Sequence, residues 1–145
     1  MASWRDVRRV VAALPGTSEG TSASGRLWWV VRGKSIAWER PLRKSDLAEL
    51  GERAPNGPIL GVRTADLEMK EALLGRDCEV YFTTRHFDGY PAVLVQLRNI
   101  SVNELKDLIL EAWLVRAPKR MADAYLQSRK SAALRPAPAR RKRRP

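Results

Sequence analysis

The sequence has little of the chemistry on which small enzymes and metal-binding proteins depend. It contains one cysteine, Cys78, and one histidine, His86. A single cysteine cannot form an internal disulfide, and one cysteine with one histidine is too few for a zinc site. The sequence also has no Gly-rich phosphate loop and no Gly-x-Ser-x-Gly nucleophile motif. These absences argue against a disulfide framework, an enzyme, a metal site and any other cofactor.

Long apolar segments are also missing. No hydrophobic run approaches the ~18 residues that span a bilayer. The first residues, Met-Ala-Ser-Trp-Arg-Asp-Val-Arg-Arg, lack the apolar core of a signal peptide. Because a lone cysteine also suits a reducing compartment, we expect a cytoplasmic protein with no membrane partner.

What the chain does have is positive charge, and nearly all of it lies near the C-terminal end. Residues 116–145 contain eleven lysines or arginines and one acidic residue, Asp123, while the net charge of all 145 residues is +11. Residues 131–145 contain few apolar side chains, so they cannot bury enough surface to offset the entropy of ordering them. We therefore predict a domain over residues 1–128 and a disordered Arg/Pro/Ala-rich basic tail over residues 129–145.

Residue periodicity and turn residues predict the elements of the domain. The stretch from Thr17 to Gly25, rich in Thr, Ser and Gly, is predicted to be a loop. The predicted order favours an α+β fold, in which an antiparallel sheet of two hairpins plus a short strand is covered by helices on one face. The expected helices are 3–14, 44–52, 65–74, 101–116 and 119–129, and the expected strands are 27–31, 35–39, 59–62, 80–83 and 92–97.

Trp28 and Trp29 are adjacent in one predicted strand, so their side chains point to opposite faces of the sheet. One ring enters the core. We expect a helix to cover the other ring, although an exposed indole could instead stack on a base or hold an apolar ligand. Trp38 and Trp113 are predicted core residues, and Trp4 is expected between the first helix and the sheet.

Four blocks of the sequence occur in a familiar order. They are 13–20 (Ala-Leu-Pro-Gly-Thr-Ser-Glu-Gly), 70–74 (Lys-Glu-Ala-Leu-Leu), 82–95 (Phe-Thr-Thr-Arg-His-Phe-Asp-Gly-Tyr-Pro-Ala-Val-Leu-Val) and 111–120 (Glu-Ala-Trp-Leu-Val-Arg-Ala-Pro-Lys-Arg). In this arrangement the chain resembles the MmcQ/YjbR family over about residues 5–125, outside the basic tail.

The resemblance implies a compact α+β fold of the frataxin-like or double-wing type, and members of the family are usually described as DNA-binding. That description is an analogy at the level of the fold, and a fold does not fix a function. The chain departs from the family pattern at Arg85, where the resemblance leads one to expect proline after Thr-Thr. This loop is therefore more basic than the family pattern implies.

Cations at two loop tips and in the tail are the candidate DNA-binding residues. The first tip has Arg32 and Lys34 on either side of Gly33, and the second loop contains Arg85 and His86. Each tip could reach phosphates or could be an ordinary solvated turn. A basic tail can follow a phosphate backbone by releasing counterions, without reading sequence. The candidate set is Arg32, Lys34, Arg85, His86, Lys119, Arg120, Arg129, Lys130, Arg140, Arg141, Lys142, Arg143 and Arg144.

His86 could act as a catalytic base only beside a positioned nucleophile or substrate proton, and no motif supplies one. Its loop ends with Gly89-Tyr90-Pro91. We therefore expect the imidazole to fix the shape of the loop through a hydrogen bond to the backbone.

The sequence thus predicts a non-enzymatic, monomeric protein that binds duplex DNA, or RNA, with little sequence preference, mainly through its tail. One alternative is a domain that binds a protein or a small ligand, with the tail only tethering it to nucleic acid. Another is an enzyme that uses His86. Convergence of Arg32, Lys34, Arg85 and Lys119 on one side of the domain would favour direct docking on DNA, and scatter would favour the tether.

Overall fold

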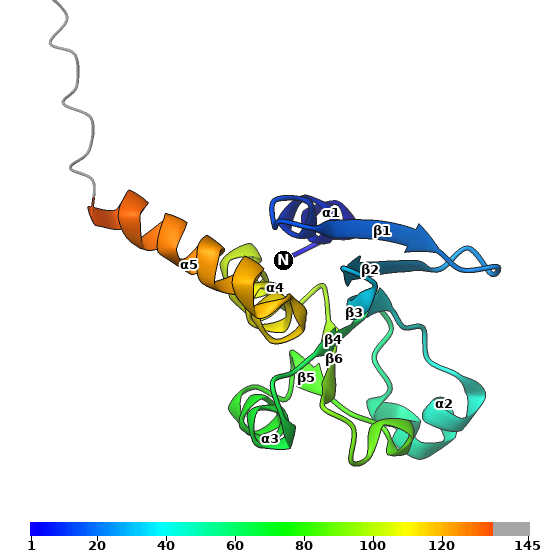
Figure 1. Ribbon diagram of the computed structural model, residues 1–145. Helices are drawn as coiled ribbons and strands as arrows, with labels where there is room; N and C mark the ends of the chain where they lie inside the picture. Colours follow the sequence, from blue (N-terminus) through cyan, green and yellow to red (C-terminus); the bar gives the residue numbers. More distant parts are fainter. Residues whose placement is uncertain (135–145) are drawn as a thin grey trace, which may run out of the picture.

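An antiparallel sheet of six strands organises the part of the chain that the structure describes, residues 1–134 (Figure 1). In this computed structural model the strands are β1 (Thr17–Thr21), β2 (Leu27–Val31), β3 (Lys34–Glu39), β4 (Ile59–Arg63), β5 (Tyr81–Phe82) and β6 (Ala92–Gln96), in the order β1-β2-β3-β4-β6-β5. The helices are α1 (Trp4–Ala12), α2 (Lys44–Leu50), α3 (Leu67–Arg76), α4 (Val102–Arg116) and α5 (Lys119–Leu134), with short 3-10 helices η1 (Gly51–Arg53) and η2 (Arg85–Phe87). The predicted α+β class with an antiparallel sheet is confirmed.

The main core lies between one face of the sheet and helices α1 and α4. Trp29 of β2 and Trp113 of α4 are both fully buried there. Trp4 stacks on Trp29 with ring centroids 6.2 Å apart, which confirms its predicted place between α1 and the sheet. Ser3 caps α1 and Ser101 caps α4 through backbone N–H groups three residues later, as the sequence pattern predicts.

The opposite face of the sheet carries a smaller apolar cluster. Its buried members include Ile59, Phe87 and Leu94, with Trp38 packed against them. Helix α2 and the η2 segment lie on this side, away from α4 and α5 (Figure 1). Within the described residues no helix covers Trp28, and 38% of this residue is exposed. The expectation of a covering helix at Trp28 was wrong.

Strand β1 occupies the first five residues of the stretch from Thr17 to Gly25 that was predicted to be a loop. It pairs with β2 from Thr17 opposite Val31 to Thr21 opposite Leu27. Threonine favours the extended backbone, and Gly20 leaves room for a tryptophan of the neighbouring strand, because a Cβ there would collide with the Trp28 indole. Gly20 therefore serves packing at a sheet edge, whereas Ser22 and Gly25 make the turn between β1 and β2.

Helix α5 is longer than predicted and includes residues 129–134, which the sequence pattern places in a disordered tail. Alanine, leucine, lysine and arginine in this stretch are strong helix formers, and the first proline comes only at Pro136. The rest of the predicted tail, with Arg140, Arg141, Lys142, Arg143 and Arg144, lies outside the described residues. Within residues 1–134 no helix is both long and apolar enough to cross a bilayer.

Candidate nucleic-acid interface

The tip of the β2–β3 hairpin presents Arg32 and Lys34. Arg32 and Gly33 both have positive φ, 49° and 81°, which is the backbone of a two-residue type I′ turn. Val31 pairs with Lys34 across this turn. Both cationic side chains are exposed, so the turn presents them to solvent as predicted.

This tip lies beside the corner between α4 and α5. The Arg32 N–H donates to the Gly16 carbonyl oxygen at 3.3 Å. A Cβ at Gly16 would lie 2.8 Å from Met121 Cε in the first turn of α5. That turn begins with Lys119 and Arg120, both exposed. The structure thus places two sets of candidate cations, from distant parts of the sequence, next to each other.

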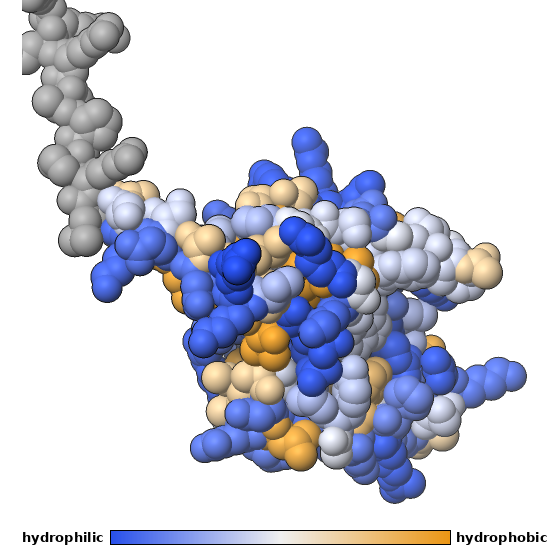
Figure 2. Space-filling view, viewed as in Figure 1, coloured by the Kyte–Doolittle hydropathy of each residue, from blue (hydrophilic) through white to orange (hydrophobic). Residues whose placement is uncertain are grey.

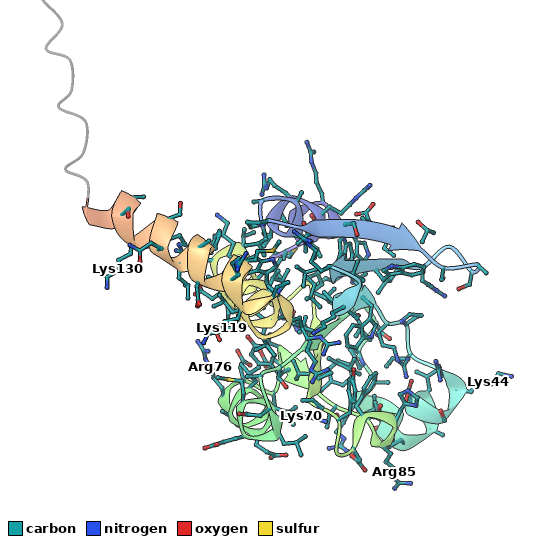
Figure 3. All side chains as sticks on the ribbon, viewed as in Figure 1. Lys44, Lys70, Arg76, Arg85, Lys119 and Lys130 are labelled. Carbon is teal, nitrogen blue, oxygen red and sulfur yellow. The ribbon has the colours of Figure 1, made fainter. Side chains whose placement is uncertain are left out.

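Helix α5 packs on the domain only near its start. Ala122 is buried and Tyr125 half-buried, whereas every side chain from residue 126 to residue 132 is exposed. We call residues 126–132 the α5 arm; it runs outward from the body (Figure 1), and Lys130 points away from the body (Figure 3). The guanidinium of Arg129 lies 5.9 Å from the centre of the Tyr125 ring. The arm therefore holds Arg129 and Lys130 where a partner could reach them.

The second candidate tip, η2, lies elsewhere. The backbone N–H of Arg85 donates to both carboxylate oxygens of Glu49, at 3.0 and 3.2 Å, which ties η2 to α2. Figure 3 shows Arg85 on the α2 side of the molecule, well separated from Lys119 and Lys130. Arg85 and His86 are exposed. The candidate cations are therefore divided between two surfaces and do not converge on one.

His86 does not hold its loop in the way that the sequence suggested. Among residues 1–134 its imidazole makes no hydrogen bond, and it packs edge-on against Phe87 at 4.9 Å. The loop is held instead by Lys70 of α3, whose Nζ donates to the carbonyl oxygens of Phe87 at 2.5 Å and Tyr90 at 3.0 Å. Lys70 is only 4% exposed, and this burial lowers its pKa.

A buried ion pair holds the segment between β3 and α2. Arg40 Nη2 and Asp46 Oδ2 are 3.0 Å apart, and both side chains are almost fully buried. Burial alone would raise the pKa of Asp46, but the backbone N–H of Arg43 and the Arg40 guanidinium together hold that pKa below its usual value. The Arg40 guanidinium also lies 5.3 Å from the centre of the Phe87 ring. It links the segment after β3 to η2.

No protein-family model matches the sequence. The chain is 51% identical over 129 residues to the uncharacterised proteins Rv2570 and MT2646 of Mycobacterium tuberculosis and Mb2600 of Mycobacterium bovis, a match that covers 87% of this chain and 97% of each relative. It belongs to the Rv2570 family. Among solved structures, the fold is similar to that of the Deinococcus radiodurans protein DR2400, a DUF419 domain. That match has a TM-score of 0.61 and 20% identity, and it covers 97% of this chain and 94% of the other.

In this member of the Rv2570 family, sequence reasoning missed Lys70 and the Arg40–Asp46 pair. Lys70 bonds to residues 17 and 20 positions later, and no local pattern indicates such a partner. A weak signal existed for Arg40, because it follows the predicted strand directly and precedes Pro41. Neither position stood out from the other charged residues of a sequence in which 30% of residues are charged.

Proposed function

We propose that the protein binds duplex DNA with little sequence preference, through phosphate contacts of the α5 arm and of the basic residues that follow it in the sequence. The observation that carries the proposal is that Arg129 and Lys130 stand on an exposed helix directed away from the body. The sequence beyond this helix continues into Arg140–Arg144. Cations presented in this way can approach a phosphate backbone without obstruction from the domain.

The cations that lie beside the α5 arm would orient the domain on the duplex. Arg32 and Lys34 at the hairpin tip, with Lys119 and Arg120 at the α4–α5 corner, would meet the duplex beside the arm. The sequence blocks and the DUF419-like fold support membership of the MmcQ/YjbR family. We assign the protein a non-enzymatic role in the cytoplasm, as a monomer that binds DNA or RNA.

Salt dependence tests this proposal. If five to eight phosphates are contacted, log K against log salt has a slope of about −4.5 to −7. Truncation after Tyr125 removes residues 126–132, whose side chains are all exposed, together with the residues that follow them. It should make the slope shallower by about 0.9 for each phosphate that the shortened chain no longer reaches. Fluorescence anisotropy of a labelled duplex measures both slopes. The control is Arg5→Gln with Arg53→Gln, two exposed cations outside the candidate set; an unchanged slope after truncation would contradict the proposal.

The division of cations between two surfaces favours a second candidate function. Here the domain binds another ligand, and the basic end only tethers it to nucleic acid. Replacing Arg32 and Lys34 by glutamate distinguishes direct docking on DNA from tethering. Direct docking predicts that the slope of log K against log salt becomes shallower by about 2. The tether predicts unchanged duplex affinity.

A further inference from the structure

The open face of the sheet carries two tryptophans that lie flat on neighbouring strands. Trp28 and Trp38 are directly opposite each other in β2 and β3. A Cβ at Gly20 of β1 would collide with the Trp28 indole, and one at Gly61 of β4 would collide with the Trp38 indole. Each indole therefore covers a glycine of the strand beside it. The two rings therefore extend away from each other, Trp28 over β1 and Trp38 over β4.

A groove follows these rings across the sheet; we call it the Trp28 groove. Its first part, about 580 Å³, lies between Trp28, Trp38 and the segment after β3. Its second part, about 330 Å³, reaches Tyr90. Both parts are lined by Trp38, His86 and Phe87, so they adjoin each other along these side chains. Aromatic side chains therefore line the groove from Trp28 at one end to Tyr90 at the other. These two end residues are 38% and 43% exposed.

The charges along the groove are mainly positive. Its first part is lined by Arg26, Arg40 and Arg43 and by one acid, Glu39. Arg26 lies 3.6 Å from Glu39, a loose exposed pair, and Arg40 is neutralised by Asp46. Arg43 is exposed and forms no ion pair within residues 1–134. Arg43 is therefore the groove cation best placed to meet an anion.

We infer that the Trp28 groove binds single-stranded nucleic acid, with an unpaired base stacked on the Trp28 indole and the backbone phosphates beside Arg43 and Arg26. Aromatic faces spaced along a positively charged groove suit successive bases, because every base has a π face whatever its identity. A duplex cannot use this site, since its bases are already stacked on one another. The site lies on the opposite side of the sheet from α4 and α5, so it does not depend on the duplex binding proposed above.

The indole N–H signals of the full-length protein give a direct test. Each of the five tryptophans gives its own signal in a proton–nitrogen correlation spectrum, and single Trp→Phe changes assign them. Addition of a ten-residue oligothymidylate should move the signals of Trp28 and Trp38. The fully buried Trp29 and Trp113 serve as internal references. A ten-base-pair duplex should leave the Trp28 signal in place.

Two substitutions complete the test. Trp28→Leu should weaken oligothymidylate binding roughly tenfold or more, while the four remaining indole signals show that the domain is folded. Arg43→Gln should weaken binding, and Lys44→Gln should not, because Lys44 is the next residue but points away from the body (Figure 3). The inference is overturned if oligothymidylate leaves the Trp28 signal unmoved, if the duplex moves it equally, or if Trp28→Leu binds as tightly as the native chain.

Discussion

At the scale of single residues, the most consequential side chain is a buried lysine. Lys70 Nζ donates to two carbonyl oxygens of the loop that carries Arg85 and His86. Replacing Lys70 by methionine keeps the length of the side chain but removes both charged hydrogen bonds, so that the Phe87 and Tyr90 carbonyl oxygens keep only the backbone N–H groups of Tyr90 and Ala92 as donors. Hydrogen bonds to charged groups are worth about 1.5–3 kcal/mol, so we expect Lys70→Met to lower the free energy of unfolding by about 2–3 kcal/mol. Urea denaturation measures this loss.

The same lysine makes stability depend on pH. Burial lowers the pKa of Lys70 in the folded state below its ordinary value of 10.5. Between these two pKa values the unfolded chain binds more protons than the folded chain, so stability rises with pH over that window. The native chain should gain stability relative to Lys70→Met as pH rises toward 10.5. Lys34→Met, at an exposed turn, should show neither the loss nor the pH effect; equal behaviour of the two variants would refute the role of Lys70.

At the scale of elements, local patterns predicted most of the fold and failed where packing decides. Ser3 and Ser101 begin helices as their spacing indicates. Strand β1 was missed because its glycine is required by the Trp28 ring of another strand, an interaction that a local pattern does not contain. The last turns of α5 were missed because low apolar content indicates disorder, although alanine and leucine favour helix even when a side chain is exposed.

The two glycines that lie under the tryptophan rings allow a prediction about the stability of glycine-to-alanine variants. Gly61 lies in β4 under Trp38, which packs against the buried Phe87 with ring centroids 6.4 Å apart. Gly20 lies in the edge strand β1 under Trp28, which is exposed enough to move. We therefore expect Gly61→Ala to cost about 1–3 kcal/mol of stability through overpacking, and Gly20→Ala to cost less. Thermal unfolding of the two variants compares them, and equal losses would mean that Trp38 moves as freely as Trp28.

At the scale of the whole molecule, Figure 2 shows a surface that is mostly hydrophilic, with some apolar side chains exposed over α3. The charge imbalance along the chain could be predicted from the sequence by counting residues. The division of the candidate cations between two surfaces could not be predicted, because it follows from which strands pair and which face each loop crosses. Arg32 and Arg85 are similar exposed loop cations in the sequence, yet they belong to different sides of the sheet.

The α5 arm and the Trp28 groove lie on different sides of the sheet, so they should bind their ligands independently. Trp28→Leu should leave duplex affinity unchanged, while Arg129→Gln with Lys130→Gln should weaken duplex binding. For oligothymidylate both changes should weaken binding, since the α5 arm attracts any phosphate backbone. Because distant sites without shared partners add within about 0.3–0.5 kcal/mol, the triple variant should bind duplex as weakly as Arg129→Gln with Lys130→Gln alone. Anisotropy titrations of the four proteins at one salt concentration provide this cycle, and a larger coupling energy would mean that a bound strand contacts the groove and the arm as one continuous surface.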